Sequence, residues 1–106
     1  MTGVEIQSRV EAHDVVVKVR GELDLASAPQ LERELREVED SDPSRIVLDL
    51  SELAFMDASG ISLVIRALRS ADANGHRLAV RPGPANVQRV FALAGLVDQL
   101  TFVPEV

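Results

Sequence analysis

The sequence predicts an α/β fold with the element order β-β-α-β-α-β-α-β and a mainly parallel mixed sheet that starts with an N-terminal antiparallel hairpin. Short runs of strand character alternate with amphipathic segments of helical length, and helical crossovers between strands produce parallel pairing. The first two strand-like runs are separated by a short turn, which is typical of a hairpin. The 106 residues are about one domain in size, so we expect residues 1–106 to form a single domain.

The predicted hairpin joins residues 4–10 to residues 15–20. In the second strand Val15, Val17 and Val19 alternate with their neighbours. A strand with one buried face has this period, so we expect these three valines to face the core and their neighbours to face outward.

The first helix is predicted over residues 28–41. Ser27 and Gln30 have the spacing of a capping box at its start. Leu31 and Leu35 then recur four residues apart, which indicates an amphipathic helix with one buried face.

The acidic residues are concentrated around this helix. The stretch from Glu22 to Asp42 carries eight acidic and two basic side chains, and with them the whole net charge of −6. One interpretation is a solvated helix face that keeps the protein soluble. The other is a surface that steers a basic protein partner. The sequence alone leaves the role of the acidic helix 28–41 open.

The second half of the chain continues the alternation. Residues 46–48, 78–80 and 100–103 read as strands, and residues 51–56 as a connector. The second helix follows Asp57, and its predicted inner stripe consists of Ile61, Val64, Ile65, Leu68 and Ala71. Glycines stop the second and third helices, at Asn74-Gly75 and, after residues 84–94, at Gly95.

Composition excludes several classes of function. The chain has three Phe and no Tyr or Trp, and its acidic balance is unsuited to neutralising phosphates, so we expect no nucleic-acid partner. It has no Cys, so thiolate catalysis and zinc–thiolate sites are excluded. We expect His13 and His76 to be surface histidines, and no metal or cofactor. The start has no signal-peptide pattern and no run is long enough for membrane insertion, so we expect a cytoplasmic protein.

Enzyme signatures are missing. The sequence lacks the glycine-rich dinucleotide and P-loop motifs and the nucleophile elbow G-x-S-x-G. Asp24 and Asp57 both follow strands and could converge on one sheet edge, where a paired-carboxylate hydrolase or a phospho-accepting aspartate is conceivable. A receiver-type site needs a lysine near the end of a later strand, but the only lysine is Lys18. We therefore expect a protein that is not an enzyme.

The start of the second helix is the remaining local feature. Asp57 suits an N-cap and Gly60 a tight turn. Counting 100° per residue places Leu63 away from the inner stripe, where we expect it to be exposed. An exposed patch at a helix N-terminus is typical of a protein-docking surface. The predicted partner-binding residues are Asp24, Asp57, Ser59, Gly60, Ser62, Leu63 and Arg66.

Four blocks in this order and spacing resemble the STAS domain in its stand-alone form, the anti-sigma factor antagonists, or anti-anti-sigma factors. They are the residues 21–24 (GELD), 46–50 (IVLDL), 55–61 (FMDASGI) and 87–96 (VQRVFALAGL). The resemblance covers nearly the whole chain and implies a STAS-like fold.

The resemblance also implies a function in transcription regulation by partner switching. Members of this family bind an anti-sigma factor, often a histidine-kinase-like ATPase that is itself a serine kinase, and so release a sigma factor. Phosphorylation of a serine at the start of the second helix abolishes binding, and a PP2C-type phosphatase restores it. An alternative role within the same fold is that of a STAS adaptor subunit of an ABC-type lipid transporter ATPase.

The sequence departs from the family pattern at two places. The usual phosphate acceptor directly follows the aspartate, and here that position is Ala58, which has no hydroxyl. Ser59 is the candidate phosphorylation site if the acceptor has moved; otherwise the chain is an unswitched antagonist or an adaptor. In addition, residues 101–106 end where longer members continue into a final helix, so contacts made by such a helix are not expected.

Overall fold

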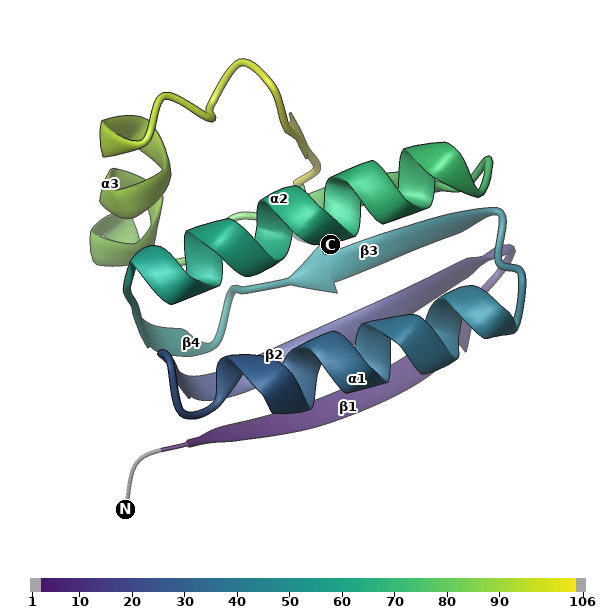
Figure 1. The fold of residues 1–106 in the computed structure, drawn as a ribbon, viewed down its shortest axis with the longest axis horizontal. Helices are drawn as coiled ribbons and strands as arrows, with labels where there is room; N and C mark the ends of the chain where they lie inside the picture. The colour runs from purple at the N-terminus through teal and green to yellow at the C-terminus, as the bar shows by residue number, and fades with distance from the viewer. Residues whose placement is uncertain (1–2, 105–106) are drawn as a thin grey trace.

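The computed structural model describes residues 3–104, which contain a six-stranded mixed sheet and three helices (Figure 1). The elements are β1 (Val4–Glu11), β2 (Asp14–Leu23), α1 (Ala28–Asp40), β3 (Arg45–Asp49), β4 (Leu53–Met56), α2 (Ala58–Ala73), β5 (Arg77–Arg81), α3 (Ala85–Leu93) and β6 (Thr101–Phe102). The strand order is β1-β2-β3-β5-β6, with β4 also on β2. β1 is antiparallel to β2 and the other pairs are parallel, which confirms the predicted fold class.

Strand β4 corrects the prediction that residues 51–56 are a connector. β2 continues beyond β3: residues 14–18 pair with β3 and residues 21–23 pair with β4. β4 therefore satisfies backbone groups that the end of β2 would otherwise leave unpaired. The pairing shifts register after Gly21, whose φ is +103° and where a Cβ would lie 2.3 Å from the carbonyl oxygen of Gly3. A run of four residues is too short for its period to reveal a strand.

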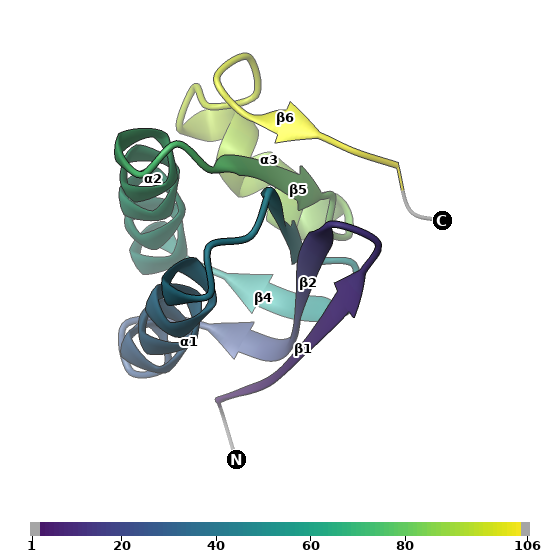
Figure 2. The same cartoon turned by 90° about the vertical axis from the view of Figure 1, so that its right-hand side faces the viewer.

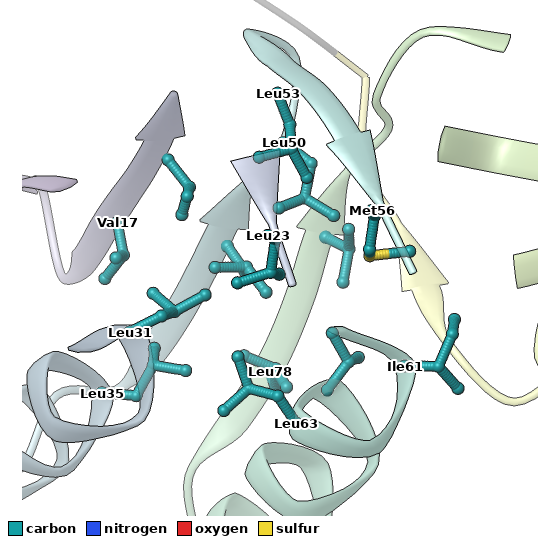
Figure 3. Packing of buried hydrophobic residues seen from close by; sticks show 14 of the residues in the cluster. Val17, Leu23, Leu31, Leu35, Leu50, Leu53, Met56, Ile61, Leu63 and Leu78 are labelled. Carbon is teal, nitrogen blue, oxygen red and sulfur yellow. The ribbon is translucent and has the colours of Figure 1, made fainter. Parts of the chain in front are cut away.

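Helices α1 and α2 lie together over one face of the sheet (Figure 2). Leu31 and Leu35 of α1 join Val17 of β2 and Leu78 of β5 in one buried cluster, part of which is shown in Figure 3. Val17 and Val19 are fully buried, as predicted, whereas Val15 is only partly buried. Apolar contact between helices and sheet is the main stabilising contribution to this fold.

Leu63 is 1% exposed, so the prediction that it is an exposed docking residue is wrong. The prediction from 100° per residue assumed that the stripe facing the sheet is the whole buried face of α2. However, α2 also packs against α1, and Leu63 lies on that side, where it lines the space between the helices together with Leu35. The buried face of α2 is therefore wider than one stripe, and Figure 3 shows Leu63 within the core cluster.

The other face of the sheet also contains buried groups. Val16, expected to face outward, is 1% exposed, so the prediction of a one-sided strand is wrong there. Asp49 of β3 and Arg81 of β5 are register partners on the same face as Val16, and both are buried. The Arg81 guanidinium lies 3.5 Å from the Asp49 carboxylate and 3.3 Å from that of Glu11, in the hairpin. This ion-pair network connects the hairpin to the opposite part of the sheet.

The helix ends follow the predicted stops, but one cap differs. Gly75 and Gly95 have φ values of +77° and +73°, the left-handed conformation of helix C-termini. Ser27 and Gln30 do not form the predicted capping box: the Ser27 hydroxyl donates to the carbonyl of Glu22, and the Gln30 amide reaches the carbonyl of Val4. The Ser27 hydroxyl closes the turn before the helix, so it cannot also cap the first turn.

His76 is buried, so the prediction of a surface histidine is wrong. Its Nε2 lies 2.8 Å from a carboxylate oxygen of Asp42, and its Nδ1 lies 3.6 Å from Glu39. His76 directly follows the glycine that ends α2, and this turn folds it back toward the end of α1. His13, by contrast, is exposed in the hairpin turn.

Candidate partner-binding site

The two predicted aspartates come together at the end of the sheet. Leu23 and Met56 are register partners in the parallel pair β2–β4. The residues that follow them, Asp24 and Asp57, therefore leave the sheet side by side, and the Asp57 amide donates to the Leu23 carbonyl at 3.2 Å. The sequence prediction that both residues lie at one sheet edge agrees with this geometry.

Each aspartate organises the start of a helix. One oxygen of Asp24 accepts hydrogen bonds from the amides of Ala26 and Ser27, both at 3.0 Å. Asp57 is the N-cap of α2, as predicted, and accepts from the amide of Ser59 at 2.8 Å. Because one oxygen of each carboxylate accepts from the chain's own amides, the two aspartates fix the turns at which α1 and α2 begin.

Gly60 is buried beneath this surface. A Cβ at Gly60 would lie 2.4 Å from Cγ of Met56 and 3.1 Å from a methyl group of Leu23. α2 therefore approaches the ends of β2 and β4 so closely that only glycine fits there without a shift. We assign Gly60 a positioning role in the site, since its surface does not face solvent.

A groove lies between the N-terminal halves of α1 and α2, with a volume of about 280 Å³. Three of the predicted residues line it: Ser59, Ser62 and Arg66. Its remaining lining residues are Leu25, Ala28, Pro29 and Glu32. We call these seven residues the docking groove. Asp24, Asp57, Gly60 and Leu63 support it from outside its lining.

Leu25 is one of the four groove residues that the sequence did not predict. Its side chain is 78% exposed, although leucine is strongly apolar. It stands in the turn between Asp24 and α1, which the hydrogen bonds of the Asp24 carboxylate hold in place. An apolar residue between a strand end and a helix start, outside both periodic patterns, is the signal that could have revealed it.

An ion pair bridges the two helices at one end of the groove. The Arg66 Nε donates to a carboxylate oxygen of Glu32 at 2.8 Å, and Arg36 lies 3.6 Å from the other oxygen. The hydrogen bond from Arg66, together with both positive charges, holds the pKa of Glu32 below its ordinary value. Beyond the bridge a smaller hollow of about 160 Å³ continues between the helices, lined in part by Leu63 and Ser70.

Two other kinds of site find no support within residues 3–104. No group of three His, Asp or Glu side chains there is arranged to hold a metal ion. No helix in that part of the chain has the length and apolar character needed to cross a membrane.

The comparisons with known proteins agree with this fold. A family model described as "Mlab, STAS domain" matches residues 6–104. An anti-sigma factor antagonist from Mycobacterium paratuberculosis has 23% sequence identity and a TM-score of 0.85, over 97% of this chain and 87% of that chain. The anti-sigma factor antagonist SpoIIAA in its unphosphorylated form has 24% identity and a TM-score of 0.81, over 96% and 89%.

A region of a much larger protein also has this fold. In murine Solute Carrier 26 family member A9, an anion transporter, the match has 17% identity and a TM-score of 0.78, over 92% of this chain and 17% of that chain. The search of curated proteins gave no match. At these identities the solved structures show a shared fold, and the family model shows the family.

Proposed function

Because the chain belongs to the STAS domain family, we propose that it is an anti-sigma factor antagonist, which binds an anti-sigma factor and so releases a sigma factor. The observation that carries this proposal is the docking groove at the start of α2. The shared fold with two anti-sigma factor antagonists supports it. In this proposal residues 1–106 act as one cytoplasmic STAS domain that binds and catalyses no reaction.

The chemistry of the groove suits a protein partner. Leu25 and Pro29 offer exposed apolar surface, while Ser59 and Ser62 add hydroxyl groups beside them. Protein interfaces combine an apolar anchor with polar groups around it, and a rigid surface loses little entropy on binding. The hydrogen bonds of Asp24 and Asp57 provide that rigidity.

In this proposal the partner is an anti-sigma factor of the histidine-kinase-like ATPase type that phosphorylates serine. Ser59 is the candidate acceptor, since Ala58 cannot accept phosphate. A phosphoserine carries roughly −1.5 to −2 charges at neutral pH. At Ser59 this charge would enter the groove next to Glu32, obstructing the surface that the partner contacts. A PP2C-type phosphatase would then restore binding.

A matched pair of leucine substitutions tests the groove. Leu25→Asp should weaken binding to the anti-sigma factor by at least about tenfold, because it places a charge in the apolar anchor. Leu93→Asp is the control, since Leu93 is 81% exposed on α3 and lies outside the groove lining. Isothermal titration calorimetry gives both affinities. Equal loss in the two variants, or no binding of the unaltered chain at micromolar concentration, would contradict the proposal.

Mass spectrometry separates a switched from an unswitched antagonist. After incubation with the kinase and ATP, a gain of about 80 Da that is absent in Ser59→Ala identifies Ser59 as the acceptor. If the mass does not change while binding is intact, the chain is an unswitched antagonist. A gain that persists in Ser59→Ala would remove Ser59 from the proposed switch.

A second candidate function is an adaptor subunit of an ABC-type lipid transporter ATPase. Two findings favour it: the matching family model carries the description "Mlab, STAS domain", and the same fold occurs within a membrane transporter. Co-purification from the native cell separates the candidates. A transporter ATPase bound through Leu25 would support the adaptor, and an anti-sigma factor bound through Leu25 would support the antagonist.

A further inference from the structure

β1 forms one border of the sheet and has a free edge. It pairs with β2 along its whole length, and within residues 3–104 no other strand pairs with it (Figures 1 and 2). One hydrogen bond shows which backbone groups of β1 point toward β2. The carbonyl of Gly3 accepts from the amide of Glu22, which lies opposite it across the hairpin. In antiparallel sheets such hydrogen-bonded positions alternate. Odd-numbered residues of β1 therefore bond to β2, and even-numbered residues direct their N–H and C=O groups outward.

A side chain of α1 supports this assignment. The Gln30 amide reaches the carbonyl of Val4 at 3.5 Å from outside the hairpin. Val4, Ile6, Ser8 and Val10 are thus the residues whose backbone groups face outward, and among these groups the Val4 carbonyl already accepts a long hydrogen bond from Gln30. Val10 is also 74% exposed, which leaves an apolar side chain at the border of the sheet.

The residues along this edge are self-complementary. Along the sequence, Glu5 and Arg9 are each two residues from Gln7, and Val4 and Val10 are each three residues from it. If a second copy of β1 pairs antiparallel around Gln7, Glu5 of each copy stands opposite Arg9 of the other. Val4 then stands opposite Val10, which covers the exposed valine. Opposite charges and apolar pairs in these positions stabilise a sheet.

The backbone hydrogen bonds and the side-chain pairs both favour the register centred on Gln7 over the neighbouring registers. Around Gln7, outward-facing residues meet outward-facing residues, so the edge groups can form hydrogen bonds. If the two-fold axis moves by half a residue, even-numbered residues of one copy stand opposite odd-numbered residues of the other. The outward N–H and C=O groups of one strand then meet backbone groups that are already bonded to β2. A centre at Ser8 places Glu5 opposite Glu11, and a centre at Ile6 pairs Glu5 with Gln7. Only the register around Gln7 pairs each Glu5 with an Arg9.

We propose that the β1 edge is a homodimerisation surface, on which a second copy of this chain pairs antiparallel around Gln7 and extends the sheet. Arg9, which already contacts Glu11 at 2.5 Å, would bridge that residue and Glu5 of the second copy. The docking groove stays free, because the α1 residues Gln30 and Glu34 face β1 whereas Glu32 faces α2. This inference is therefore independent of the proposed function.

A single cysteine on the two-fold axis tests the register. Residues opposite each other at non-hydrogen-bonded positions have Cα atoms about 4.5 Å apart, within the range that a disulfide spans. The chain has no other cysteine. Gln7→Cys in the full chain should form a disulfide-linked dimer under mild oxidation. Glu5→Cys is the control, because it would lie opposite Arg9. Absence of cross-linking at position 7, or equal cross-linking at both positions, would overturn the register.

A charge exchange tests the recognition itself, with sedimentation velocity as the measurement. Glu5→Arg and Arg9→Glu each place like charges opposite one another, so each variant alone should associate about tenfold more weakly than the unaltered chain. Mixing the two variants restores both opposite-charge pairs and should restore the dimer. A monomer at every concentration of the unaltered chain, or a mixture no more associated than its components, would refute the proposal. Circular dichroism of each variant checks that the fold is retained.

Discussion

Leu63 fills the space between α1, α2 and the sheet, with 1% of its surface exposed. Removing most of such a side chain leaves a cavity. We therefore expect Leu63→Ala to lower the free energy of unfolding by about 2–5 kcal/mol. Urea unfolding followed by circular dichroism gives the value. Leu93→Ala, at an exposed leucine, should change it by no more than about 0.5 kcal/mol. Similar values for the two variants would show that Leu63 is not part of the core.

At the residue scale, the N-cap role of Asp57 could be predicted from local sequence, whereas the role of Ser27 could not. Asp57 caps α2 because the N-cap bond involves only its own first turn. Ser27 has the same local signal, but its amide donates to the carboxylate of Asp24, three residues earlier, and its hydroxyl donates to the carbonyl of Glu22. Two capping groups compete for the same turn, and the spacing alone does not decide between them. Gly60 was predicted for a turn, whereas the contact with Met56 that requires glycine depends on a strand the sequence did not reveal.

At the element scale, His76 connects the ends of α1 and α2. The hydrogen bond to Asp42 raises the pKa of His76, against the effect of burial, and Glu39 adds to the rise. Since the pKa is higher in the folded state, protonated His76 stabilises the fold. This contribution is complete below the unfolded pKa of about 6.5 and is lost as the pH rises through the folded value.

The corresponding prediction concerns thermal stability as the pH rises from below about 6.5, the ordinary pKa of histidine. The midpoint of unfolding should fall with rising pH in the unaltered chain, and Asp42→Asn should reduce this dependence, because it removes the main partner of the imidazolium. His13→Gln is the control, since His13 is exposed in the hairpin turn. Differential scanning fluorimetry gives the midpoints. An unchanged pH dependence in Asp42→Asn would contradict the role of this pair.

The sequence largely predicted which helices and strands form, but it did not predict how they pack against one another. The period of Leu31 and Leu35 identified α1 because a helix has to bury one face. The same reasoning failed for Leu63, since a sequence period cannot show that a helix packs against both a sheet and another helix. The docking groove lies along that helix pair. Its serines and Arg66 could therefore be predicted from one helix, whereas the place of Glu32 in the groove depended on how the helices pair.

At the scale of the whole molecule, the distribution of charge connects the fold to binding. The net charge of −6 lies between Glu22 and Asp42, and α1 carries five of these eight carboxylates, of which Glu32 lines the docking groove. Some are used within the structure: Glu32 bonds Arg66, and Glu39 accepts from the Ser70 hydroxyl at 2.7 Å. Glu37 and Asp40 are exposed. Exposed charges act over about a Debye length, which grows from roughly 8 Å at physiological salt to roughly 30 Å at 0.01 M salt, and so affect the encounter with a partner more than the bound complex.

We therefore expect the double variant Glu37→Gln/Asp40→Asn to slow association with a basic anti-sigma factor severalfold at low salt, while the dissociation rate stays nearly constant. The difference between the variant and the unaltered chain should shrink as salt is added, because screening removes the same attraction. Stopped-flow kinetics at two ionic strengths measures both rates. Glu5→Gln is a matched control, since it removes an exposed charge on β1, away from the groove. Equal association rates for all three chains would instead identify the acidic face of α1 as a solvated surface with no part in recognition.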